Sequence, residues 1–461
     1  MGTKISIIGA GSAVFSLSMI RDMCLTPNLQ GSTVTFMDVN EERLDAAYGL
    51  CQRYADQVGI ELNLHKTTDR REALRGAEFV VNTALVSGHR AMQDGWEIAR
   101  KHGYRFGGSY HVVHDEAFWI NFYQFRFFED VVEDILEICP DAWHLLVANP
   151  VLAGVTHLSR QYPHHKLVGL CHGYNGVYHL ASVLGLDRDR ITFELPGVNH
   201  FIWLTHLYHD GQDAMALIDR WIENEAPRYW ETCHPCDGMG PKAVDLYQRF
   251  GAFPIGDTGN PGGGTWPWWY HVDDATEKRW REDPTEWWHG DRGYFQGTAA
   301  QVAEIARIAA DESIRVTDHF PPRMSGESMV PIIESIACDV PRVYIVNIPN
   351  SGDFVPGVPR DFEVEVPALV SKRGIQGIQT GGLPPALISY ILHDRVAPVN
   401  VELEAYEAGS KQLLLQLILM DPWTRSEQQA RDLLQDILDL PYHQEMREHY
   451  RWPDLPISQL L

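Results

Sequence analysis

Positive charge is scarce in this 461-residue sequence: 38 lysine and arginine residues stand against 62 acidic residues, and the formal net charge is −24. Nucleic acids and anionic membranes bind proteins through basic surfaces, so this excess of acid argues against both as partners. Long apolar runs are also missing. The most apolar late run, residues 413–420, is interrupted by Gln416 and is too short to span a bilayer. We therefore expect no nucleic-acid partner and no membrane-spanning segment.

Cysteine is sparse as well, with seven residues scattered along the chain. An odd number without regular spacing is typical of reduced thiols in the cytoplasm rather than of a disulfide framework. From Met1 the chain runs directly into a strand pattern, without the apolar region and cleavage site of a signal peptide. These absences predict a cytoplasmic protein. Cys233 and Cys236 form a lone CxxC, which without a second pair indicates incidental thiols more than a zinc or redox site.

The length exceeds what one ordinary core holds, so we expect two lobes or one large elaborated domain. The chain begins with a nucleotide-binding pattern. Residues 4–8 form a β-branched run that ends in a glycine turn, and a helical pattern follows. Gly9 and Gly11 would let the backbone approach a pyrophosphate at the helix N-terminus, although Val14 replaces the third glycine of the usual fingerprint.

A carboxylate closes the next predicted strand, residues 32–37, at Asp38, where it can accept hydrogen bonds from an adenosine ribose. A third predicted strand, residues 78–81, ends at Asn82. Together these elements make a βαβαβ unit of a Rossmann-like parallel sheet, and NAD is favoured over NADP because Asp38 would repel a 2′-phosphate. A flavodoxin-like or nucleotide-free α/β domain is the alternative. The residues predicted to bind the cofactor are Gly9, Gly11, Ser12, Ala13, Val14, Asp38 and Asn82.

A second pattern lies in residues 170–203, where a thiol and an imidazole each close a short apolar run. Cys171 and His200 would then stand at the ends of strands that lead into a cleft. Sulfur together with imidazole suits a divalent transition metal. Asn149 ends another predicted buried strand, residues 143–149. Its amide would orient a substrate hydroxyl or cap a loop.

Two polar segments leave alternatives open. Residues 110–115 would line the same cleft, or Asp115 would cap the long amphipathic helix expected over residues 118–138. In residues 362–367, apolar side chains alternate with Glu363 and Glu365, which predicts a half-exposed strand. From Pro384 onward the pattern is helical.

Several short motifs follow one another along the chain: Ile8-Gly9-Ala10-Gly11-Ser12-Ala13-Val14-Phe15, Ala148-Asn149-Pro150, Cys171-His172-Gly173, Gly197-Val198-Asn199-His200, Gly256-Asp257-Thr258, Trp269-Tyr270-His271 and Ser325-Gly326-Glu327. In order and spacing they resemble the family 4 glycoside hydrolases, from the glycine turn to Leu440-Pro441. We therefore expect an α/β fold with a Rossmann-like, lactate/malate dehydrogenase-like NAD domain over residues 1–195. An α+β catalytic and oligomerisation domain would occupy residues 196–461.

The resemblance implies an unusual hydrolysis. In that family NAD⁺ oxidises C3 of the sugar, the C2 proton is removed, the glycosidic oxygen is eliminated, water adds and the hydride returns. A divalent metal, usually Mn²⁺, binds the C2 and C3 oxygens. The implied cofactors are thus NAD and Mn²⁺ or another divalent transition metal. The implied partners are a small carbohydrate substrate and further copies of the chain in a homodimer or homotetramer.

Matched residue by residue, the resemblance assigns the metal to Cys171 and His200 and the acid at the leaving group to His172. Asp257 would be the base at C2. A tyrosine is the alternative base, and the candidates are Tyr247 and Tyr270. The substrate contacts expected are Asn149, at the C3 oxygen, Asn199 and Arg90.

The expected substrate follows from what surrounds these motifs. Residues 259–265 carry no charge, whereas α-glucosidase-like members have an arginine shortly after Gly-Asp-Thr, and Arg90 is the predicted substitute. His172-Gly173 argues against the phospho-glycosidases. We expect an α-glucosidase or α-glucuronidase type of enzyme that acts on α-glycosides of a non-phosphorylated hexose or hexuronic acid. The competing interpretation is an NAD-dependent 2-hydroxy acid dehydrogenase of the lactate/malate type, which would need an arginine clamp and no metal thiolate.

Overall fold

The computed structural model describes residues 2–260, 266–291 and 293–452. Most of the uncharged loop that follows the Gly-Asp-Thr motif, residues 261–265, therefore lies outside the described residues. Within the described residues, no helix is both long and apolar enough to cross a membrane.

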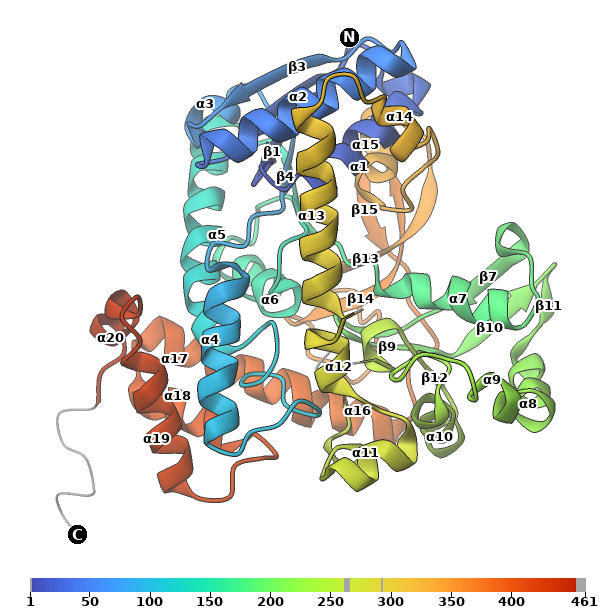
Figure 1. Ribbon diagram of the computed structural model, residues 1–461, viewed down its shortest axis with the longest axis vertical. Coiled ribbons are helices and arrows are strands. Elements are labelled where there is room, and N and C mark those ends of the chain that lie inside the picture. Colours follow the sequence, from blue (N-terminus) through green and yellow to red (C-terminus); the bar gives the residue numbers. More distant parts are fainter. Residues whose placement is uncertain (1, 261–265, 292, 453–461) are drawn as a thin grey trace.

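A parallel sheet forms the first half of the chain (Figure 1). Its strands are β1 (Lys4–Ile8), β2 (Thr33–Met37), β3 (Asn63–Thr67), β4 (Phe79–Asn82), β5 (Trp143–Leu146) and β6 (Leu167–Gly169). They lie in the order β3-β2-β1-β4-β5-β6, and each neighbouring pair is parallel. This is the strand order of dinucleotide-binding sheets, in which ligands bind at the carboxyl edge. The predicted Rossmann-like α/β class is confirmed.

The helices of this part of the chain are α1 (Ala13–Cys24), α2 (Glu41–Val58), α3 (Arg70–Ala73), α4 (Gly88–Lys101), α5 (Phe118–Ile138), α6 (Val151–Gln161) and α7 (Gly176–Val183). The predicted helix over residues 118–138 is confirmed to the residue by α5. The strand count was wrong, since the predicted third strand is β4 and the sequence analysis missed β3. β3 is a polar edge strand with only Leu64 buried, so it carries no apolar signal.

The same sheet continues into the second half of the chain. β13 (Arg342–Pro349) pairs antiparallel with β6 and with β14 (Glu363–Ser371). Beyond β14 follow β8 (Gly197–Val198), β9 (Phe201–Leu204) and β12 (Phe253–Ile255), while β15 (Gly374–Gly377) pairs with β14. A small separate sheet contains β7 (Ile191–Glu194), β10 (His206–His209) and β11 (Gln212–Asp213). The division at residues 195 and 196 falls between β7 and β8 and stays our proposal.

The remaining helices complete an α+β half, as predicted. They are α8 (Met215–Asn224), α9 (Ala226–Tyr229), α10 (Pro241–Phe250), α11 (Asp274–Trp280), α12 (Pro284–His289), α13 (Tyr294–Ala310), α14 (Val316–His319), α15 (Met329–Ala337), α16 (Pro385–Ile391), α17 (Ala397–Ala408), α18 (Lys411–Leu419), α19 (Glu427–Leu438) and α20 (Gln444–His449). Helices α17 to α20 gather beside α4, at the opposite end of the molecule from α2 and β3 (Figure 1).

Helix α13 links the two halves, running from α2 and α14 to α12 (Figure 1). Arg53 of α2 holds the C-terminal end of α13. The guanidinium donates to the carbonyl oxygens of Ile308 at 2.9 Å, Asp311 at 2.9 Å and Ile314 at 2.6 Å. Because the last carbonyls of a helix have no partner within it, a cation there satisfies them and complements the helix dipole.

A buried ion pair joins α10 to the segment between α11 and α12. Lys242 Nζ lies 2.8 Å from Glu282 Oε2, and the two side chains are 0% and 1% exposed. Cys236 lies beside this pair, and its Sγ accepts the N–H of Asp283 at 3.0 Å. Burial, with the charge of Glu282, raises the pKa of the Cys236 thiol well above its usual value. The second cysteine of the CxxC motif, Cys236, is therefore a buried and unreactive thiol.

Replacing Lys242 with methionine should lower the free energy of unfolding by about 3 to 5 kcal/mol, because Glu282 stays buried and loses its lysine counter-ion. Urea denaturation followed by circular dichroism measures the change. Arg307→Met is the matched control, since Arg307 pairs with Glu304 on the surface and such pairs contribute at most about 1 kcal/mol. Equal losses in both variants would contradict the assigned importance of the buried pair.

Candidate active site

The glycine turn after β1 is shaped for close contact. Gly9 has a φ of +88°, and a Cβ there would lie 2.8 Å from Ala84, which follows β4. The N–H groups of Gly9 and Ala10 both donate to the carbonyl oxygen of Met37, each at 2.9 Å. Helix α1 then begins at Ala13 without a side-chain cap or an acidic residue in its first turn. Its first N–H groups therefore remain available for an anion such as a pyrophosphate.

Asp38 and Asn82 stand at the same edge of the sheet. Asp38 follows β2 and accepts the N–H of Gly11 and the N–H of Asn40, each at 2.9 Å. Asn82 ends β4 and is fully buried, and its Oδ1 accepts the N–H of Ala84 at 3.2 Å. Its Nδ2 has no hydrogen-bond partner among the described residues. A buried amide donor and a carboxylate beside a glycine turn fit a dinucleotide.

Three potential metal ligands converge beyond the end of β6. Cys171 follows β6, His200 sits in the turn between β8 and β9, and Asp257 lies on the 3₁₀ turn η4 (Gly256–Thr258). Their ligand atoms all lie within 4.8 Å of one another, and His200 Nε2 is 3.3 Å from Asp257 Oδ2. His200 has a φ of +58°, a conformation that costs energy in a non-glycine residue and is often found at functional sites.

Local contacts explain why these ligands meet. The Thr258 hydroxyl accepts the N–H of Ile202 at 2.7 Å and donates to the carbonyl of Ile202 at 3.0 Å, which ties η4 to β9. Gly256 has a φ of +57°, and a Cβ there would lie 2.4 Å from the carbonyl oxygen of Gly173. Only glycine allows the turn after Cys171 to approach the turn that carries Asp257 this closely.

Buried carboxylates surround His200. Glu116 Oε1 lies 3.3 Å from His200 Nδ1, and its second oxygen accepts the Tyr110 hydroxyl at 2.7 Å. On β14, Glu363 accepts the backbone N–H of Asn199 and Glu365 accepts its side-chain amide, each at 3.1 Å. The prediction of a half-exposed strand over residues 362–367 was therefore wrong. β14 lies inside the sheet, and both glutamates are 0% exposed on the side of the ligands.

This crowding changes the acidity of the site. Burial raises the pKa of Glu365 to about 7, and burial also raises the pKa of Glu363 well above its ordinary range. Burial and the carboxylates of Glu365 and Asp257 raise the pKa of the Cys171 thiol, although the N–H of Gly173 opposes this from 3.4 Å. A divalent cation would reverse the balance and bind the thiolate. The set of sulfur, imidazole and carboxylate donors fits a transition metal.

A second group of ligands shares His200. It contains His114 and Asp115, whose Nδ1 and Oδ1 atoms are 3.0 Å apart. Asp115 also accepts the side-chain amide of Asn149 at 2.8 Å, so Asn149 reaches the same cluster. The alternative in which Asp115 caps the following helix was wrong, because the capping position of α5 is Ala117.

Comparison with known proteins places the chain in a family. Residues 4–186 match the model described as family 4 glycosyl hydrolase, and residues 195–424 match the family 4 glycosyl hydrolase C-terminal domain. The chain belongs to the family 4 glycosyl hydrolases. It is an enzyme of the glycoside hydrolase class, and the hydroxy acid dehydrogenase interpretation is set aside.

The curated relatives differ in sugar. The chain is 28% identical to an alpha-glucosidase of Erwinia rhapontici, over 91% of this chain and 94% of the relative. It is 24% identical to an alpha-galacturonidase of Thermoanaerobacterium saccharolyticum, over 94% and 95%. Among solved structures, a 6-phospho-alpha-glucosidase from gut microorganisms in complex with NAD and Mn²⁺ superposes with a TM-score of 0.79 at 19% identity, covering 99% of this chain and all of that one. The family is shared, and the sugar is not fixed by it.

His172 of this glycosyl hydrolase lies at the exposed side of the site, where the charges of Asp257 and Glu365 act on it. Its side chain is mostly exposed, and Nδ1 lies 3.5 Å from Glu327 Oε1. The hydrogen bond to Glu327 raises the pKa of His172, so the imidazolium form persists to higher pH. A charged imidazole at the entrance of the site suits a proton donor.

The structure separates several predicted residues from this cluster. Tyr247 lies on α10, where burial and Asp219 raise its pKa to about 12. Tyr270 is buried and donates to Asp245. Arg90 is exposed on α4, and its charge acts on Tyr442. Their assigned roles stay predictions, but these three side chains have no described contact with the ligands.

The sequence analysis missed Tyr294. It begins α13, is 46% exposed, and has a raised pKa because of burial and the carboxylates of Asp115 and Asp257. Its ring lies 5.8 Å from that of His89. A tyrosine that far along the chain carries no local signal, since only the path of α13 brings it to the site.

Replacing Glu116 with glutamine should lower the affinity for Mn²⁺ by about 10- to 100-fold, because the imidazole of His200 loses the carboxylate that orients it. Isothermal titration calorimetry with MnCl₂ measures the change. Glu129→Gln is the matched control, since Glu129 accepts a hydrogen bond from His157 at 2.7 Å in a comparable pair away from the ligands. Wild-type affinity in a folded Glu116→Gln variant would contradict this role.

Proposed function

We propose that this family 4 enzyme hydrolyses α-glycosides of a non-phosphorylated hexose or hexuronic acid, with NAD and Mn²⁺ or another divalent transition metal as cofactors. The observation that carries the proposal is the convergence of Cys171, His200 and Asp257, whose ligand atoms lie within 4.8 Å of one another. A relative named alpha-glucosidase, 28% identical, supports an α-glucoside as the substrate. Relatives named alpha-galactosidase and alpha-galacturonidase support galactose and galacturonic acid as further candidates.

Charge favours a neutral hexose. The ionisable groups around the ligands in the described part of the chain are mainly carboxylates: Asp115, Glu116, Asp257, Glu327, Glu363 and Glu365. A phosphate needs a cationic pocket, and those of these carboxyl groups that are ionised repel it. The same repulsion acts more weakly on a uronate with one negative charge. We therefore rank a neutral hexose first, a uronate second and a phosphosugar last.

The residues divide the chemistry between them. When bound, NAD⁺ supplies a hydride acceptor for C3, and the metal supplies positive charge at the sugar oxygens. Cys171 and His200 would hold the metal, with Glu116 orienting the imidazole. Asp257, partly exposed beside them, accepts the C2 proton, and His172 donates a proton to the leaving oxygen.

The other assigned contacts complete the proposal. Asn149 would bind the C3 oxygen, and its position beside Asp115 supports this. Asn199 is fully buried, and its side-chain amide donates a hydrogen bond to Glu365. It would therefore act on the substrate indirectly, by holding the strand that carries the ligands in place. Tyr294 is a second candidate for the base at C2. A cytoplasmic location and a homodimer or homotetramer remain predictions from the sequence.

The reaction is tested with purified protein, Mn²⁺, NAD⁺ and 4-nitrophenyl α-glycosides of glucose, galactose, glucuronic acid, galacturonic acid and glucose 6-phosphate. Nitrophenol release should require NAD⁺ without net NADH accumulation, because the hydride returns in each turnover. Removal of the metal with EDTA should abolish release, and added Mn²⁺ should restore it. Stoichiometric NADH, or no release from any glycoside, would contradict the proposal.

Cys171→Ala and His200→Ala should each abolish hydrolysis and weaken Mn²⁺ binding, because each removes one ligand from an open site. NAD⁺ binding, followed by quenching of tryptophan fluorescence, should persist, since the glycine turn is untouched. Cys139→Ala provides the control, because Cys139 is a buried cysteine at the C-terminal end of α5 in an apolar cluster that contains none of the proposed ligands. Turnover retained in either ligand variant would show that the ligands are misassigned.

A further inference from the structure

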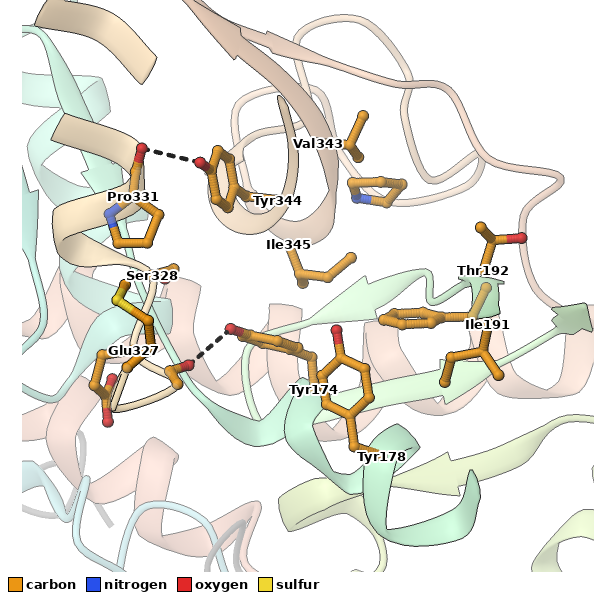
Figure 2. A pocket seen from close by; sticks show the side chains of 14 residues that line it. Tyr174, Tyr178, Ile191, Thr192, Glu327, Ser328, Pro331, Val343, Tyr344 and Ile345 are labelled. Atoms are coloured by element: carbon orange, nitrogen blue, oxygen red, sulfur yellow. Dashed lines mark hydrogen bonds between the residues drawn. The ribbon is translucent and has the colours of Figure 1, made fainter. Parts of the chain in front are cut away.

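A cavity of about 420 Å³ is lined in part by Glu327, the carboxylate that pairs with His172 (Figure 2). Glu327 belongs to both sites, since its carboxylate lies 3.5 Å from His172 Nδ1 and its side chain lines the cavity. The rest of the wall comes from segments far apart in sequence: the turn into α7, strand β7, the start of α15 and strand β13. The cavity is therefore a product of the fold rather than of one loop.

Aromatic rings form one side of this cavity. Tyr174 and Tyr178 have ring centroids 6.4 Å apart, and Tyr178 meets Phe193 edge to face at 6.0 Å. The Tyr174 hydroxyl donates to the carbonyl of Gly326 at 3.4 Å, as Figure 2 shows. The guanidinium of Arg188 lies 4.1 Å from the centroid of Tyr178. These contacts hold the rings in place, so they offer a preformed surface to a ligand.

The chemistry of the wall limits what can bind. Among the described residues that line the cavity, Glu327 is the one acidic residue, and none is lysine, arginine or histidine. The other side chains are aromatic, apolar or hydroxyl-bearing. Thr192, Ser328 and Tyr344 supply the hydroxyls. An anion inside the cavity would therefore face the Glu327 carboxylate, with no basic side chain among these described lining residues. A neutral ring with a flat apolar face and a few polar groups matches such a surface.

We propose that this cavity receives the leaving group of the glycoside and accepts a neutral ring, either a second sugar or an aryl group. The inference rests on the proposed function, in which His172 protonates the glycosidic oxygen. A proton donor must lie within reach of the bond that breaks, so the departing group lies on the His172 side. Glu327 connects that position to the cavity.

The test uses the methyl, 4-nitrophenyl and disaccharide α-glycosides of the sugar that the wild type prefers. The methyl group is too small to fill the cavity, so the methyl glycoside reports on the active site without the cavity. Tyr178→Ala should raise KM for the two larger substrates about 3- to 10-fold with kcat retained, since it removes binding made equally in ground and transition states. KM for the methyl glycoside should change by less than about twofold. If KM rises only for the 4-nitrophenyl glycoside, the cavity accepts an aryl leaving group. If it rises only for the disaccharide, the cavity accepts a sugar.

Val343→Trp is the second variant, because Val343 lines the cavity yet is 58% exposed, so a larger side chain fills the space without entering the core. It should raise KM for the larger substrates in the same way. Tyr208→Ala is the control: Tyr208 lies on β10 of the same small sheet, outside the cavity wall. It should leave all three KM values unchanged.

The outcomes separate this inference from the proposed function. A wild type inactive on all three glycosides overturns the proposed function itself. An active wild type whose Tyr178→Ala and Val343→Trp variants affect all substrates equally, or none, overturns the assignment of the cavity alone. A change of molecular mass on gel filtration in Val343→Trp, with KM unchanged, would make the cavity a contact between copies of the chain and also overturn it.

Discussion

The crowding of buried carboxyl groups around one histidine is the constraint on which the rest of the site depends. Glu116, Glu363 and Glu365 are all 0% exposed, and Cys171 and Asp257 face the same space. Charged groups are costly to bury unless opposite charge compensates them. The protein provides part of that compensation through His200 and the amide of Asn199. A divalent cation at Cys171 and His200 would favour the ionised forms of these groups, so their crowding is itself an argument for a metal.

The continuity of the sheet explains how this charge is assembled. The parallel strands bring the glycine turn, Asp38 and Asn82 to one edge, and β6 delivers Cys171 at its end. β14 then places its glutamates behind His200, because β14 lies between β13 and β8 in the same sheet. Arg53 anchors α13, whose other end carries Tyr294 towards the ligands. Both halves of the chain therefore build one site, which couples the folding of the sheet to the formation of the active site.

Sequence patterns predicted what depends on local signals. The bounds of α5 were found because a strongly amphipathic helix of 21 residues repeats its signal over several turns. The ligands Cys171 and His200 were found because each follows an apolar strand. β3 was missed because an edge strand needs little apolar character, and Glu363 and Glu365 were judged half-exposed because alternation does not reveal what covers the polar face. Glu116 and Tyr294 depend on long-range packing, which no single segment of sequence encodes.

The central claim is that a metal binds to Cys171 and His200, with Asp257 beside it as the base, and the position of the metal can be observed directly. A crystal grown with Mn²⁺ would give an anomalous difference map measured near the manganese edge. The account predicts one strong peak within coordination distance of Cys171 Sγ and His200 Nε2. A peak at His114 and Asp115 out of reach of Cys171, or manganese bound only elsewhere in the molecule, would contradict it.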